Sequence, residues 1–263
     1  MNDLHFIFGG GSITNSPWLT WKDFVIERYN IRDVDCCAVK GVGNEFIKWS
    51  VLNKIKPNSV ACLMFTNIDK WDWMVNDVET AEKINREEKH NVIDLEGQRS
   101  NQGFWCTGSW FPVYKEHYKK NYYNQTYMLG KTLECICFLQ TFFEQRKIPY
   151  LLLFDSPILQ ITEQEIYQGM DKGTLAQESK NPLIEFWYDL IDWSKIYQPG
   201  LIGFCDQNNL PWINKKFGAH PPSSSHLNFC NQHVFPFLDQ YTAVQQPDLE
   251  WMAKKFDNMW QET

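Results

Sequence analysis

The sequence lacks the long apolar runs that cross membranes. None of its segments approaches the roughly 20 consecutive apolar residues that a membrane-spanning helix needs. Its first residues do not combine a basic stretch with a following apolar core, which is the pattern of a secretory signal peptide. We therefore expect no signal peptide, no membrane partner and a cytoplasmic location.

The sequence also lacks the basic clusters of nucleic-acid-binding proteins. Its formal net charge is −7 and its pI is about 5.4. A protein that binds duplex nucleic acid usually gathers Lys and Arg on one face, and no cluster of that size is visible. We expect no nucleic-acid partner.

Signals for a metal site are weak. None of the eight cysteines forms a CxxC pair, and most lie in apolar runs, which is typical of buried, reduced thiols. Asp69, Asp72 and Asp77 lie close together in sequence and would suit a metal, but their polar surroundings favour solvated loop charges. We expect no metal and no disulfide framework.

What the sequence does contain is an alternation of short apolar runs and helical stretches. Strands are expected at 4–8, 34–39, 59–66, 150–154 and, as a short fifth strand, 201–205. Helices are expected at 18–29, with Ser16 as N-cap and Pro17 in the first turn, and at 44–55, 114–146 (one helix or two), 182–193, 224–238 and 248–261. Strands separated by helices predict an α/β fold in which helices cover a parallel sheet. The chain 1–263 is expected to form one domain with an irregular, Trp-rich insertion at about 67–112.

Glycine and polar residues follow the expected strands, where α/β sheets bind ligands. The turn Gly9–Ser12 would suit an anion, yet the Lys-Ser/Thr pair of a P-loop and the third glycine of a dinucleotide fingerprint are missing. A nucleotide site is the weakest alternative, and we expect no cofactor.

Acyl transfer fits these residues better. Ser12 would be the nucleophile, and His220 or His226 the base that removes its proton. Backbone N–H groups of Ser12 and of the Gly41 turn, together with the Asn67 amide, would stabilise the oxyanion.

Four segments resemble the sequence blocks of the SGNH/GDSL hydrolase superfamily, in the family's order. They are Gly-Gly-Gly-Ser12-Ile-Thr-Asn, Ala38-Val-Lys-Gly41-Val-Gly43-Asn44, Phe65-Thr-Asn67-Ile-Asp-Lys and His220-Pro-Pro-Ser-Ser-Ser-His226. The layout is also similar to SGNH-like proteins of marine bacteriophages. If the chain is encoded by a phage, its expected location is the virion. The resemblance implies a three-layer α/β/α sandwich with a flavodoxin-like parallel sheet of about five strands. It also implies cofactor-free hydrolysis of acyl esters, often acetyl esters, of small molecules or carbohydrates. Ser12 would be the nucleophile, and Gly41 and Asn67 would complete the oxyanion hole.

The sequence departs from the family pattern in its acidic residues. Gly11 stands where the family has Asp before the serine, and no Asp precedes His220 or His226 by two or three residues. Three interpretations of this missing acid remain open. Catalysis would use a Ser–His dyad, or an acid from elsewhere such as Asp206 or Asp155 would serve, or activity would be lost. The alternative function is therefore a catalytically degenerate SGNH-fold module that binds a glycan or a protein partner.

Overall fold

The structure is a computed structural model of the 263-residue chain. It describes residues 4–68, 70, 72–75, 92–93, 104–107, 125–156, 182–197, 200–213, 220–245 and 247–261.

A parallel sheet of four strands forms the centre of the described fold. In spatial order its strands are β2 (Val34–Cys36), β1 (His5–Gly9), β3 (Ser59–Phe65) and β7 (Tyr150–Phe154). Every residue of β1, β3 and β7 is buried, which explains why their sequences are apolar without alternation. The first four expected strands are confirmed, although the second is three residues shorter than predicted at its carboxyl end.

The expected fifth strand at 201–205 is wrong. These residues lie in helix α8 (Gly200–Gln207). The first turn of α8 is bonded to the residue that follows β7, because Ile202 N donates to Asp155 O at 2.9 Å. Periodicity does not distinguish a strand from a buried helix in an apolar run this short. A single parallel bridge between Leu152 and Ile196 lies beside β7 instead.

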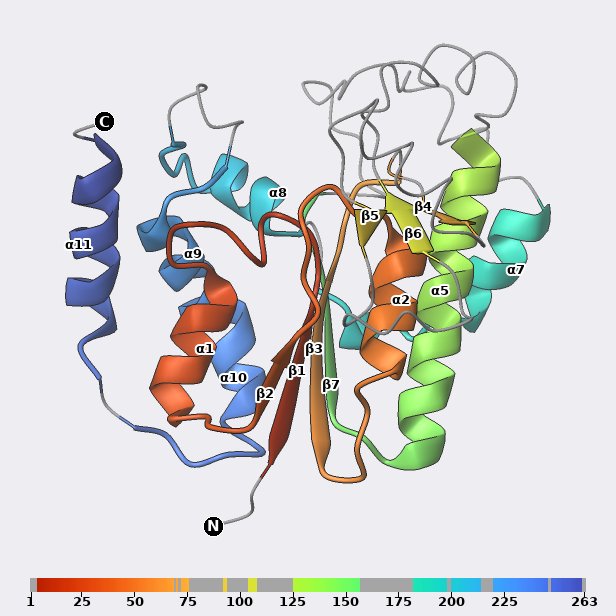
Figure 1. The fold of residues 1–263 in the computed structure, drawn as a ribbon, viewed down its shortest axis with the longest axis horizontal. Helices are drawn as coiled ribbons and strands as arrows, with labels where there is room; N and C mark the ends of the chain where they lie inside the picture. Colours follow the sequence, from red (N-terminus) through yellow and green to blue (C-terminus); the bar gives the residue numbers. More distant parts are fainter. Residues whose placement is uncertain are drawn as a thin grey trace.

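Helices flank the sheet on both sides (Figure 1). On one side lie α1 (Trp21–Tyr29), α9 (Ser223–Phe229) and α10 (Phe235–Leu238), with a π-helical segment at Cys230–Val234 between α9 and α10. On the other side lie α2 (Asn44–Leu52), α5 (Gln125–Arg146) and α7 (Pro182–Leu190), and a 3-10 turn (Trp193–Lys195) follows α7. The last helix, α11 (Leu249–Gln261), packs against α9.

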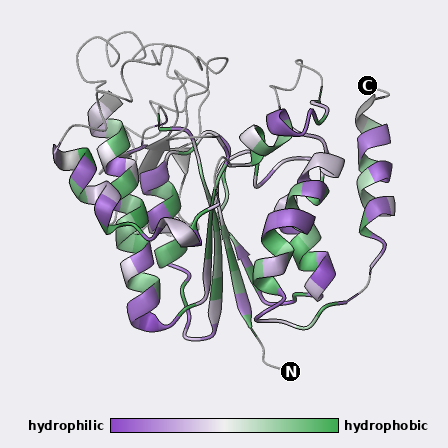
Figure 2. Ribbon diagram, turned by 180° about the vertical axis from the view of Figure 1, so that it is seen from behind, coloured by the Kyte–Doolittle hydropathy of each residue, from purple (hydrophilic) through white to green (hydrophobic). Residues whose placement is uncertain are grey.

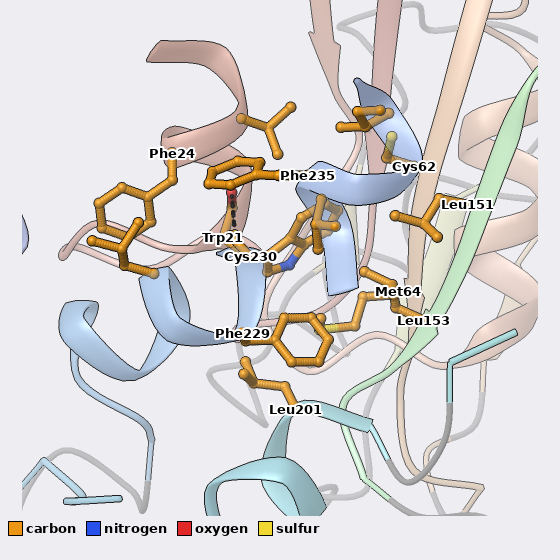
Figure 3. Close-up of a cluster of buried hydrophobic side chains, with 14 of the residues drawn as sticks. Trp21, Phe24, Cys62, Met64, Leu151, Leu153, Leu201, Phe229, Cys230 and Phe235 are labelled. Atoms are coloured by element: carbon orange, nitrogen blue, oxygen red, sulfur yellow. Dashed lines mark hydrogen bonds between the residues drawn. The ribbon is translucent and has the colours of Figure 1, made fainter. Parts of the chain in front are cut away.

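Each side of the sheet has its own apolar core, and Figure 2 shows apolar residues along the strands. On the α1 side, Trp21 is fully buried and meets the ring of Phe8 edge-to-face at 5.5 Å. Figure 3 shows Trp21 among Met64, Phe229 and Phe235, which come from three different elements. This core therefore joins the N-terminal and C-terminal parts of the chain.

Helix α1 begins later than expected. Its N-cap is Thr20, whose backbone N–H donates to the Asp23 carboxylate at 2.8 Å, so the prediction of Ser16 as N-cap and Pro17 in the first turn is wrong. Such a reciprocal Thr–acid pair satisfies N–H groups that a helix leaves free at its start. The ten residues between β1 and Thr20 are consequently loop, and Ser12 lies within them.

The insertion is not wholly irregular. Its described residues include an antiparallel sheet of three strands, in the order β4 (Asp72–Val75), β6 (Phe104–Thr107) and β5 (Val92–Ile93). The expectation of an irregular segment is therefore wrong for these strands, and the rest of 67–112 lies largely outside the described residues. The described part of the chain holds no helix with the length and apolarity to cross a membrane.

The cysteines whose side chains the structure describes are free thiols. Cys37, Cys62, Cys135, Cys205 and Cys230 are buried, as their apolar surroundings predict, whereas Cys36 is exposed. Burial raises the pKa of the Cys37 thiol to about 12, which keeps that thiol protonated and inert at neutral pH.

Candidate active site

Ser12 lies in a tight turn at the carboxyl edge of the sheet. The backbone N–H groups of Thr14 and Asn15 both donate to Gly11 O, at 3.1 and 3.2 Å, and the Ser16 hydroxyl donates to Ser12 O. Ser16 therefore closes this turn rather than capping a helix. The turn leaves the Ser12 residue partly exposed.

The structure brings His220 to Ser12 across 208 positions of sequence. The His220 Nε2 atom lies 2.8 Å from the Ser12 Oγ atom, which is hydrogen-bond distance. The ring of Trp18 meets the His220 ring edge-to-face at 5.5 Å and so limits how that imidazole can turn. An imidazole that accepts the serine proton at Nε2 has the geometry of a general base.

His226 lies in the buried interior. It is fully buried, and its Nδ1 accepts a hydrogen bond from the backbone N–H of Trp21 at 3.2 Å. Burial, and to a lesser degree the nearby charge of His220, lowers the pKa of His226 to about 3, so the ring is neutral. The sequence left the two histidines open as candidate bases; these contacts make His226 a structural residue that ties α9 to α1.

Two charged side chains belong to the same edge of the sheet. Asp155 follows β7 directly and is buried, and Lys70 lies in the loop after β3. The Lys70 Nζ atom is 3.7 Å from Asp155 Oδ2. Burial raises the pKa of Asp155, while the charges of Lys70 and His220 act to lower it, which places His220 within electrostatic range. Asp206, the other acid considered from the sequence, is exposed on α8.

The predicted oxyanion residues lie on the loops that flank Ser12. Two hydrogen bonds join the segment before Gly41 to the Ser12 loop. Val39 N donates to Gly10 O at 3.1 Å, and Asn15 Nδ2 donates to Ala38 O at 3.0 Å. Gly41 has a φ of 78°, a conformation that glycine adopts readily. Asn67 comes two residues after the end of β3 and is partly exposed. Gly41 and Asn67 thus follow β2 and β3, the strands on either side of β1, which Ser12 follows.

Asn44, quoted above only as the end of the second block, joins both flanking loops. Its buried amide donates to Thr66 O at 3.0 Å and accepts from Thr66 N at 2.8 Å. The same amide donates to Thr132 Oγ1 at 3.0 Å. Asn44 thereby fixes the start of α2 against the end of β3, directly before Asn67. No sequence signal separates this role from that of an ordinary polar residue in a turn.

Asp72 is not the solvated loop charge that the sequence suggested. Its carboxylate accepts from the backbone N–H groups of Gly43 and Phe46, each at 2.8 Å, and so caps α2. Because the Gly43 N–H is engaged in this way, the Gly41 turn has one fewer donor to offer an oxyanion. Asp69 and Asp77 lie outside the described residues, within which no three His, Cys, Asp or Glu side chains are grouped to hold a metal.

The Asp72 cap predicts a pH-dependent stability. Burial raises the pKa of Asp72 from 3.8 to about 6, opposed by the bonds from Phe46 and Gly43. A carboxyl whose pKa is higher in the folded state binds protons more tightly there, so its contribution to stability falls as pH rises from about 4 to about 6. We expect the free energy of unfolding of the wild type, minus that of Asp72→Asn, to fall over this window by up to about 3 kcal/mol.

Chemical denaturation of both proteins at pH 4, 5, 6 and 7 measures this difference. A difference that stays constant, or that grows with pH, would contradict the buried carboxyl as its source.

Comparisons of the chain with models of protein families, with curated proteins and with solved structures found no match in any of the three.

Proposed function

We propose that the chain is an SGNH-type hydrolase that cleaves acyl esters, among them acetyl esters of carbohydrates, through Ser12. The observation that carries this proposal is the 2.8 Å contact between Ser12 Oγ and His220 Nε2 at the carboxyl edge of a parallel sheet. A serine hydroxyl is a weak nucleophile until a base takes its proton, and this contact pairs it with one.

The proposed reaction has two halves. His220 takes the Ser12 proton as the hydroxyl oxygen attacks the ester carbonyl, and N–H donors of Ser12, Gly41 and Asn67 stabilise the resulting oxyanion. His220 then returns the proton to the leaving alcohol oxygen, and the acyl group stays on Ser12. His220 then takes a proton from a water that attacks the acyl carbonyl, and it returns this proton to the Ser12 oxygen as the acid leaves.

The sheet order supports the family assignment. The order β2-β1-β3-β7 equals the first four positions of a flavodoxin-like sheet, in which ligands bind between the first and third strands. Ser12 follows β1 and Asn67 follows β3, so both lie at that point. We propose that the full domain is the three-layer α/β/α sandwich of the SGNH family, working in the cytoplasm or in a virion.

Covalent labelling tests the proposal directly. We expect a fluorophosphonate probe to label the folded wild-type protein once, and peptide mapping to place the adduct on Ser12. The Ser12→Ala variant serves as the reference without a nucleophile, and Ser194→Ala, at an exposed serine outside the Ser12 loop, as the matched control that keeps one. Absence of label on Ser12 in a protein with an intact unfolding transition would refute an active nucleophile.

The alternative is a module that keeps the fold and binds a glycan or a protein without cleaving it. The missing Asp before His220 favours this alternative. It predicts no label on Ser12, no release of acetate from acetylated oligosaccharides, and glycan binding that is equal in the wild type and Ser12→Ala. Calorimetric titration with those oligosaccharides separates the two functions.

A further inference from the structure

We propose that Lys70 gives the site a preference for ester substrates that carry a carboxylate, on the acyl group or on the alcohol portion, because its ammonium binds that anion beside Ser12. This inference rests on the hydrolase function proposed above and narrows its substrates. Lys70 would contact the substrate without taking part in proton transfer, so it is a residue that determines specificity.

The position of Lys70 is the first observation. Its backbone N–H donates to Asn67 O at 3.3 Å, which ties Lys70 to the predicted oxyanion residue. A Cβ atom added at Gly11 would lie 3.8 Å from Lys70 Nζ, and one added at Gly43 would lie 2.7 Å from Lys70 O. Lys70 therefore borders three of the segments that form the candidate site, and its ammonium lies beside the residue that precedes Ser12.

The burial of the Lys70 side chain is the second observation. It is only 17% exposed, whereas lysine side chains are mostly exposed. The Nζ atom faces Asp155 Oδ2 at 3.7 Å, which is longer than the roughly 2.7–2.9 Å of a charge-assisted hydrogen bond. Burial raises the pKa of Asp155 in spite of this neighbour, which weakens it as a counter-ion. Because an ammonium carries three N–H donors, Lys70 can bind a second anion while it faces Asp155.

The charges around Lys70 favour an anionic ligand. Gly11 stands where the resembling family has Asp, so no acidic side chain from that position offsets the ammonium. The Asp72 carboxylate accepts from the backbone N–H groups of Gly43 and Phe46 and is thereby engaged with α2. The chain as a whole has a net charge of −7 and repels anions, so a cation at the site would attract them to this point of the surface.

Matched pairs of nitrophenyl esters test the acyl group as the source of the carboxylate. The succinyl, glutaryl and adipyl esters end in a carboxylate, whereas the butyryl, valeryl and hexanoyl esters have the same chain lengths without it. Acetylated glucuronic acid, compared with acetylated glucose, tests the alcohol portion in the same way. In at least one of these two arms we expect the wild-type kcat/KM to be about tenfold or more higher for the anionic member, the scale of a hydrogen bond to a charged group.

The variants Lys70→Met and Lys70→Arg assign that preference to the charge. Lys70→Met removes the ammonium and keeps a long, unbranched side chain, so the ratio of the two kcat/KM values should fall to within about threefold of one, whereas Lys70→Arg should retain most of the preference. Lys56→Met is the matched control, because Lys56 is 48% exposed before β3, at the opposite edge of the sheet, and should leave the ratio unchanged. A ratio measured within one protein does not depend on the fraction that is folded.

The outcomes separate the two proposals. Cleavage of the neutral esters through Ser12, with no preference for a carboxylate in either arm or with a preference that survives in Lys70→Met, would overturn the role of Lys70 and leave the hydrolase intact. An equal loss on both members of every pair in Lys70→Met would also overturn it, because Lys70 would then serve the reaction or the fold and not the choice of substrate. A wild type that cleaves no ester and takes no fluorophosphonate label would overturn the hydrolase proposal itself.

Discussion

Replacing His220 with glutamine is expected to lower the rate of Ser12 acylation by about 10⁴-fold or more, the largest loss among the single changes that keep the nucleophile. The reason is that the Ser12 hydroxyl then has no base at the 2.8 Å position where Nε2 lies in the wild type. His220 is partly exposed in a loop, so the free energy of unfolding should change little. Stopped-flow assays with an activated acetyl ester, alongside fluorophosphonate labelling, measure the rate.

His226→Asn is the matched control, because it removes the other histidine of the same sequence block. His226 contacts the backbone of Trp21 inside the core, and its loss should lower stability rather than the labelling rate of the folded protein. The opposite pattern, with His226→Asn unreactive and His220→Gln fully labelled, would show that the base has been assigned to the wrong histidine. Equal labelling of both variants would remove histidine from the proposed mechanism.

The order of elements could be predicted because apolar strands and helical stretches alternate clearly along most of the chain. β7 was predicted to the residue, and β1 and β3 to within one residue at each end, because runs of fully buried residues have sharp limits. The prediction of a strand at 201–205 was wrong because five apolar residues suit a buried helix as well as a strand. What decides between them is the bond of Ile202 N to Asp155 O at the end of β7, which is a tertiary contact.

The meeting of Ser12 with the segment His220–His226 could also be predicted, because one segment carries a candidate nucleophile and the other carries candidate bases. The sequence alone does not separate His220 from His226 as the proposed base, because both lie in one short segment. The burial of His226 and the contact of His220 with Ser12 separate them, and both depend on the fold. Asp155 and Lys70 illustrate the same limit. Each is one charged residue after a strand, and their meeting at 3.7 Å depends on the order of strands in the sheet.

The second large effect concerns stability, and it is expected for Trp21→Ala. This substitution should lower the free energy of unfolding by about 3–5 kcal/mol, the usual cost of removing a fully buried aromatic side chain. Trp21 is 0% exposed, lies against Phe8 and donates from Nε1 to Thr14 Oγ1 at 3.1 Å. For a protein of this size such a loss corresponds to a fall in Tm on the order of 10 °C. Thermal and chemical unfolding both measure it.

Trp21→Phe separates packing from the hydrogen bond. It keeps a ring in the core that Figure 3 shows and removes the donor to Thr14, which should cost about 1 kcal/mol for the bond and somewhat more for the lost ring volume. Thr14 lies in the same loop as Ser12, so fluorophosphonate labelling of this variant reports whether the core holds the nucleophile in position. We expect slower labelling in Trp21→Phe than in the wild type, because the Thr14 hydroxyl loses its donor in the core. Equal destabilisation by Trp21→Ala and Trp21→Phe would mean that the hydrogen bond, and not the buried ring, accounts for the stability.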